Sequence, residues 1–243
     1  MKTKIEQLVR DNYLRLKDDI AVTSIRCGRE IGGISPVLVA KYQPVQKINA
    51  AIKAGACHFA ENYPEMLIPK LPEIEESSLI KWHMIGHIQS RKANMVMDYF
   101  DYAHSLDSMK VAERLQRRGE ETNRNLIVLI EVNLGQEETK NGYRVGNSEE
   151  YDIFISDIAE LSKLNRLSLK GLMIMPPITQ QAEESRQYFK GLRRLMAKVN
   201  DENLNLHLTE LSMGTSQDFR IAIEEGATMI RIGTLVFGER QWQ

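Results

Sequence analysis

Lys41 is the residue of this 243-residue chain whose type and position best suit covalent chemistry. It directly follows the apolar run 37–40, which is typical of a buried β-strand. Partial burial at a strand end favours the neutral form of a lysine amine, and a neutral amine attacks carbonyl compounds to form Schiff bases. The alternative is that Lys41 simply extends from the strand end into water. The position alone leaves both interpretations open.

Two later segments combine the residue types that bind phosphate. The first is Ser-Met-Gly-Thr-Ser at 212–216, and the second is Gly233-Thr234, directly before a short expected helix through Leu235 and Phe237. Glycine backbones and helix N-termini offer free N–H groups to phosphate oxygens. The alternative is that the glycines only make turns and the serine only caps the next helix. Together with a reactive lysine, a phosphate site would suit a phosphorylated carbonyl compound, such as pyridoxal 5′-phosphate (PLP) or a sugar phosphate.

Arg231 lies inside the last apolar run, 229–232, and a buried arginine needs a partner. That partner is either a core carboxylate or a ring nitrogen of a ligand. An arginine beside a pyridine nitrogen keeps the nitrogen unprotonated, which weakens PLP as an electron sink.

His83 also lies inside an apolar run and suits either a general base or a packed side chain. We favour a packed residue or part of a ligand-binding wall. The five histidines lack the spacing of metal ligands. Asp218 and Glu210 are expected to be exposed and structural.

The elements that would position these residues alternate along the chain. Apolar residues at three- and four-residue steps predict an amphipathic helix from about Ile5 to Ile20. Strands are predicted at 37–40, 57–60, 82–85, 102–106, 126–132, 169–175, 206–211 and 229–232. Each is followed by a helical pattern or, after the last, by the short helix already described. Continuous apolar strands that alternate with helices indicate a parallel sheet, and eight such units favour one closed (β/α)8 barrel, in which functional groups lie at the C-terminal strand ends.

The composition narrows the class of protein. The net charge of -1 gives no support for a nucleic-acid or membrane surface, and 42% hydrophobic with 27% charged residues is ordinary for a globular protein. Two cysteines exclude a disulfide framework. No signal peptide or membrane span is apparent, so we expect a cytoplasmic protein.

Six short segments resemble the PLP homeostasis protein family, single-domain relatives of the alanine racemase N-terminal barrel. The resemblance runs from about Val37 to Arg240, in the family order. Its segments are 59–63 (FAENY), 82–92 (WHMIGHIQSRK), Asn133 with 140–142 (KNG), 171–173 (GLM), 211–219 (LSMGTSQDF), and 229–234 (MIRIGT) with 237–238.

The resemblance implies the fold and the ligand. Residues 1–243 would form a single PLP-binding (β/α)8 TIM-like barrel with the type III PLP fold, and residues 1–35 would supply an N-terminal helix packed on it. Lys41 would carry PLP as a Schiff base and Arg231 would contact the pyridine nitrogen. The remaining cofactor contacts expected are Asn62 and His83 on the wall, and Ser212, Met213, Gly214, Ser216, Gly233 and Thr234 around the phosphate. The first strand departs from the family pattern, since Ala40 precedes Lys41 and Tyr42 follows it.

The resemblance also implies a binding protein for vitamin B6 homeostasis, with no established enzymatic reaction. Racemases of the related fold use a second base from a further domain, and this chain is expected to lack that domain because it ends soon after the eighth strand. One rival is a weak PLP-dependent amino-acid racemase that uses Lys41 with Tyr42 or Tyr63. The other is a Schiff-base aldolase acting on a phosphorylated sugar. We expect a monomer or a weak dimer that passes PLP to PLP-dependent enzymes and binds neither nucleic acid nor membrane.

Overall fold

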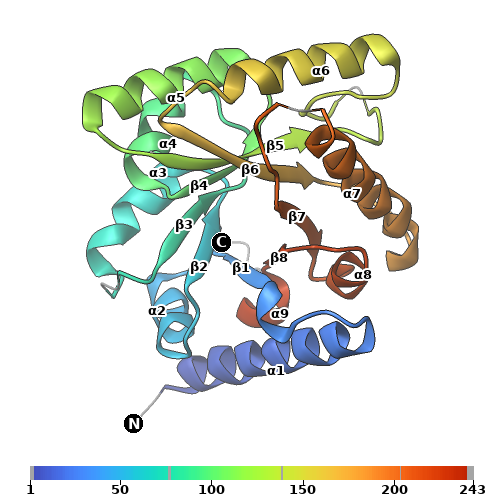
Figure 1. The fold of residues 1–243 in the computed structure, drawn as a ribbon. Coiled ribbons are helices and arrows are strands. Elements are labelled where there is room, and N and C mark those ends of the chain that lie inside the picture. Colours follow the sequence, from blue (N-terminus) through green and yellow to red (C-terminus); the bar gives the residue numbers. More distant parts are fainter. Residues whose placement is uncertain (1–2, 76–77, 138, 203, 240–243) are drawn as a thin grey trace.

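A closed barrel of eight parallel strands forms the centre of the molecule in the computed structural model (Figure 1). The structure describes residues 3–75, 78–137, 139–202 and 204–239; Arg240, where the family resemblance ends, lies outside them. Neighbouring strands pair in chain order, and β1 also pairs with β8 to close the barrel. The strands are β1 (Ser35–Val39), β2 (His58–Glu61), β3 (Lys81–Met84), β4 (Tyr102–Leu106), β5 (Leu126–Val132), β6 (Leu167–Ile174), β7 (Glu210–Thr215) and β8 (Met229–Ile232).

Helices follow the strands and cover the outside of the barrel (Figure 1). The α-helices are α1 (Lys4–Arg26), α2 (Val45–Lys53), α3 (Pro64–Leu67), α4 (Ala93–Tyr99), α5 (Met109–Thr122), α6 (Ser148–Leu161), α7 (Arg186–Asn200), α8 (Phe219–Glu224) and α9 (Thr234–Phe237). Short 3-10 helices are η1 (Ile31–Gly33), η2 (Ile68–Glu73), η3 (Ser90–Lys92) and η4 (Ala182–Ser185). Within the described residues, no helix combines the length and the apolar composition that crossing a bilayer requires.

Alternation along the strands divides the apolar side chains into two sets. Leu38 and Ala40 belong to the main core between strands and helices, whereas Val37 packs with Ala60 and Met229 inside the barrel. Successive side chains of a strand face opposite sides. The same alternation, continued past the end of β1, places Lys41 on the interior side.

The helix α1 spans the seam where the first and last strands meet. A capping box between Thr3 and Glu6 starts it, and it lies beside α2 and α9 (Figure 1). The Asn12 amide donates to the Val236 carbonyl at 3.1 Å, and Arg29, just after the helix, donates to the carbonyls of Ile223 and Ala227 at 2.8 and 2.7 Å. The predicted N-terminal helix is therefore confirmed, and it ties the start of the chain to its end.

The seventh strand is the element that the sequence analysis misplaced. It was predicted at 206–211, whereas β7 spans Glu210–Thr215. The apolar residues that suggested a strand at 206–211 lie mostly in the segment that precedes β7, and Leu208 of this segment is buried. The true strand has a polar residue, Ser212, on its interior face, so its apolar pattern is interrupted.

Gly171 in β6 lies against the backbone of β7. A Cβ atom on Gly171 would be 1.9 Å from the Glu210 carbonyl oxygen, so alanine requires the two strands to separate. We expect Gly171→Ala to lower the free energy of unfolding by about 3 kcal/mol, the upper part of the range for overpacking. Urea unfolding measures this, with Gly32→Ala as control because a Cβ there meets nothing within 4 Å. Equal stability of the two variants would contradict the argument.

Candidate functional site

Lys41 lies at the mouth of the barrel, half-buried, directly beyond the last backbone hydrogen bond between β1 and β2. That bond joins the Ala40 N–H to the Ala60 carbonyl at 2.8 Å. The chain then turns sharply, since the Gln43 N–H bonds to the Ala40 carbonyl at 3.0 Å and Tyr42 adopts a φ of 60°. A left-handed conformation is unusual for tyrosine. The turn holds Lys41 at the rim while α2 begins on the outside.

The loops after β7 and β8 meet beside the end of β1, two residues before this lysine. The Gly233 N–H donates to the Ser216 hydroxyl oxygen at 3.3 Å, which joins the two loops. A Cβ on Gly233 would lie 3.7 Å from Val39 Cβ, so the β8 exit also adjoins the β1 exit. Thr234 begins α9, and the first N–H groups of a helix lack partners within the helix. The structure therefore brings Ser216, Gly233 and Thr234 to the strand exit that carries Lys41.

Arg231 is almost fully buried inside the barrel, and neutral groups hold its guanidinium. It donates to Ser212 Oγ at 2.6 Å, to the Ile174 carbonyl at 2.8 Å and to Met175 Sδ at 2.9 Å. None of the ion pairs found among the described residues involves Arg231. Burial lowers the pKa of Arg231 to about 10, against the opposing effect of Asp218 and Glu131. Arg231 thus remains a cation at neutral pH. Its hydrogen-bond partners are neutral acceptors, and not the core carboxylate that the sequence left open as one possible partner.

Three expected cofactor residues near Arg231 have more limited roles. Ser212 is fully buried and its hydroxyl is bonded to Arg231, so it lies with the arginine in the barrel interior. The Met213 side chain is buried in the core between strands and helices. Gly214 has a φ of 91°, and a Cβ on it would be 2.5 Å from Ala222 Cβ. Met213 and Gly214 can therefore offer a ligand only backbone groups.

His83 is fully buried and joins other histidines inside the barrel. Its Nε2 is 2.9 Å from His58 Nδ1, and its Nδ1 is 2.8 Å from His104 Nε2. His104 Nδ1 in turn lies 2.8 Å from Ser212 Oγ. Burial lowers the pKa of His83 and brings that of His104 to about 3. His83 is thus a packed residue of an interior network rather than an exposed base, and the sequence analysis missed His58 and His104.

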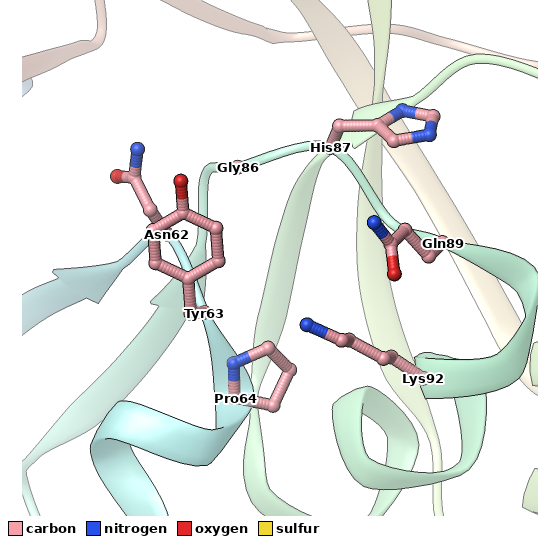
Figure 2. A pocket seen from close by; sticks show the side chains of 7 residues that line it. All are labelled: Asn62, Tyr63, Pro64, Gly86, His87, Gln89 and Lys92. Atoms are coloured by element: carbon pink, nitrogen blue, oxygen red, sulfur yellow. The ribbon is translucent and has the colours of Figure 1, made fainter.

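Asn62, the expected wall residue, lies at the end of β2 on the rim of a cavity of about 250 Å³. The cavity lies between the exits of β2 and β3, and its lining residues are Asn62, Tyr63, Pro64, Gly86, His87, Gln89 and Lys92 (Figure 2). Lys92 points across it toward Tyr63 and Pro64, with its Nζ 5.7 Å from the centre of the Tyr63 ring (Figure 2). Asn62 Oδ1 is buried and has no hydrogen-bond partner, so it is an acceptor to which a ligand could donate.

The loops after β2 and β3 approach closely at Gly86. A Cβ on Gly86 would be 2.2 Å from the Asn62 carbonyl oxygen, so only glycine allows the two loops this close.

A buried ion pair braces the rim near Lys41. Glu61 is fully buried at the end of β2, and its Oε1 accepts from Lys70 Nζ at 2.7 Å. Lys70 Nζ also lies 3.4 Å from the Ala40 carbonyl oxygen, next to Lys41 in the chain. Burial raises the pKa of Glu61, while Lys70 and Lys41 lower it. Sequence reasoning missed this pair.

The two acidic residues near the last strands are structural, as expected. Asp218 Oδ1 accepts from the Thr215 N–H at 2.6 Å and from the Thr215 hydroxyl at 3.0 Å. Glu210 accepts from the Thr228 hydroxyl at 2.6 Å. The expectation that Asp218 is exposed was wrong: it is buried because it closes the turn after β7.

Glu131 of β5 is a further interior carboxylate that the sequence analysis missed. Burial, reinforced by Asp107, raises its pKa to about 7, and Arg231 opposes the shift. The folded protein therefore holds this proton more tightly than the unfolded chain. The stability that the proton supplies is complete below about pH 4, where unfolded glutamate is also protonated, and is lost as the pH rises through 7.

Glu131→Gln should consequently gain stability over the original protein only at high pH. We expect the free energies of unfolding to be nearly equal at pH ~4.5 and the variant to be more stable by about 2–3 kcal/mol at pH ~8.5. Urea unfolding at both pH values tests this, with Glu113→Gln on the exposed side of α5 as control. A stability difference that does not change with pH would contradict the shift.

Comparisons with known proteins agree with this arrangement. Residues 39–241 match the family model of the alanine racemase N-terminal domain. The pyridoxal phosphate homeostasis protein of Escherichia coli strain K12 is 33% identical over 96% of this chain and 97% of its own, and that of Aquifex aeolicus is 36% identical over 94% and 96%. The structure of PipY from Synechococcus elongatus with PLP bound superposes with a TM-score of 0.78, at 33% identity, over 90% of this chain and 100% of PipY. The chain therefore belongs to the pyridoxal phosphate homeostasis protein family, within the alanine racemase N-terminal fold.

Proposed function

We propose that this protein binds PLP as a Schiff base on Lys41 and serves PLP homeostasis rather than an amino-acid reaction. The observation that carries the proposal is the meeting, at one edge of the barrel mouth, of Lys41 with the joined Ser216 and Gly233 loops above a buried arginine. A family member, PipY, has been solved with PLP bound.

The residues present fit the cofactor group by group. Lys41 Nζ would bond to the aldehyde carbon with loss of one water. Ser216, Gly233 and Thr234 would hold the phosphate through a hydroxyl and backbone N–H groups. Arg231 would donate to the pyridine nitrogen from a site where its other contacts are neutral. Asn62, whose side-chain oxygen Oδ1 has no hydrogen-bond partner, would lie on the rim of the barrel at the other side of the pyridine ring.

Arg231 also favours a binding role over a reaction that needs PLP as a strong electron sink. PLP acts as an electron sink when its ring nitrogen is protonated, and a cationic arginine donor keeps that nitrogen unprotonated. The two tyrosines that a racemase would recruit, Tyr42 and Tyr63, both have exposed side chains. We therefore propose a carrier or regulator that passes PLP to PLP-dependent enzymes.

The test is an absorbance spectrum of the purified protein with PLP, followed by borohydride reduction and peptide mass mapping. We expect an imine band and a reduced PLP adduct on the peptide that contains Lys41. A sugar phosphate trapped in place of PLP would instead indicate the aldolase. Exchange of the α-proton of an amino acid in deuterated water would indicate the racemase, and an adduct on other lysines would refute the assigned site.

A further inference from the structure

A row of polar side chains crosses the interior of the barrel and ends at Arg231. It comprises His58 on β2, His83 on β3, His104 on β4 and Ser212 on β7, with contacts of 2.9, 2.8 and 2.8 Å between successive members and 2.6 Å from Ser212 to Arg231. Strands β2, β3 and β4, which carry the three histidines, are neighbours in the barrel (Figure 1). The phosphate, lysine and rim groups of the proposed site do not include His58 or His104, so their burial in this row needs its own explanation.

The ionisation of the row follows from its surroundings. Burial is the main cause that lowers the pKa of all three histidines, and each ring is further affected by charged or polar neighbours. Lys81, Asp101 and Glu210 act on His58, and Arg231 acts on His104. Each ring is therefore neutral at pH 7, with one nitrogen that donates and one that accepts.

The arginine fixes the direction of the hydrogen bonds. A guanidinium only donates, so Arg231 must donate to Ser212 Oγ, and the serine hydrogen is directed to its other contact, His104 Nδ1. His104 must then carry its hydrogen on Nε2 and donate to His83 Nδ1, and His83 must donate from Nε2 to His58 Nδ1. The opposite direction would leave the buried serine hydrogen without an acceptor, which costs free energy.

We propose that His58, His83, His104 and Ser212 are positioning residues that form one unidirectional hydrogen-bond chain and hold the Arg231 guanidinium in place. The chain keeps a lone pair of Ser212 aimed at the arginine, while the Ile174 carbonyl fixes a second guanidinium nitrogen. This inference rests on the proposed contact between Arg231 and the cofactor's ring nitrogen. It adds that the contact depends on residues of four other strands, β2, β3, β4 and β7, of which β4 lies across the barrel from β8.

Nitrogen NMR of the cofactor-free protein labelled with 15N-histidine tests the direction of the chain. At pH ~7 we expect His58, His83 and His104 to be neutral with hydrogen on Nε2, and the remaining histidines, His87 and His207, to serve as exposed references. Single substitutions assign the signals. Hydrogen on Nδ1, or on both nitrogens, in any of the three rings would overturn the proposed direction, whatever the protein binds.

Binding of PLP and of 1-deaza-PLP, which lacks the ring nitrogen, tests the positioning role. His104→Leu should reduce the preference for PLP over the deaza compound by about tenfold, the equivalent of one hydrogen bond to a charged group. His104→Gln can still accept at one end and donate at the other, so it should restore most of the preference. His207→Leu should not change it.

The two tests separate the possible failures. An unchanged preference in His104→Leu would overturn the positioning role. If the original protein bound neither compound, the proposed function would fail, while the NMR result would still decide whether the directional chain exists.

Discussion

Replacing Lys41 with alanine is expected to abolish the imine absorbance and the borohydride-stable adduct, and to weaken PLP binding at least about 100-fold, or about 2.7 kcal/mol. The covalent bond is lost, whereas the phosphate and ring contacts proposed for Ser216, Gly233 and Arg231 stay. Some reversible binding should therefore persist. Titration by absorbance and fluorescence measures both effects.

Lys53→Ala is the control for Lys41, because Lys53 is an exposed lysine at the end of α2 on the same connection. It should bind PLP as the original protein does. Circular dichroism should show both variants folded, since Lys41 lies at the rim and outside the apolar core. An unchanged adduct in Lys41→Ala would refute the proposed covalent site.

Lys70→Met is expected to destabilise the fold by about 3–5 kcal/mol at neutral pH, because it leaves the carboxylate of Glu61 buried without its cation. Glu61 is fully buried, and its second oxygen already lacks a hydrogen-bond partner. Without Lys70 the largest influence that lowers the pKa of Glu61 disappears. The loss of stability should shrink as the pH falls and Glu61 becomes protonated.

The double variant Glu61→Gln with Lys70→Met separates the charge from the packing. It should recover much of the lost stability, since no buried charge remains. Lys53→Met removes an exposed pair with Glu75 at the same 2.7 Å distance and should leave stability almost unchanged. A loss in Lys70→Met that did not depend on pH would point to packing alone.

Hydrophobic pattern was sufficient to predict the architecture. Runs without alternation, such as 126–132, coincide with β5, and the helical periodicity of the first segment coincides with α1. Lys41, Gly233 and the Ser216 loop were identified because barrel function lies at strand exits, where turn residues interrupt the pattern.

The polar interior of the barrel accounts for the features that the hydrophobic pattern did not predict. Strand β7 was misplaced because Ser212 faces inward, and an inward polar residue breaks the apolar run that marks a buried strand. The histidine chain joins residues that are 25, 21 and 108 positions apart, and a single sequence gives no direct sign of such contacts. A usable sign was present, since β2, β3 and β4 each carry a histidine within an otherwise mostly apolar run.

The seam spanned by α1 has a consequence for how the barrel folds and opens. Lys41 follows the first strand and Gly233 follows the last, so the proposed site is complete only when the two ends of the chain have met. Because contacts this distant in sequence form slowly, we expect seam closure to be a late step of folding. A ligand that bridges the seam binds only the closed form, and at 100 times its Kd it stabilises that form by about 2.7 kcal/mol. Hydrogen exchange should therefore slow in β1, β8 and α9 on PLP binding, more than in β4 and β5 on the far side of the barrel.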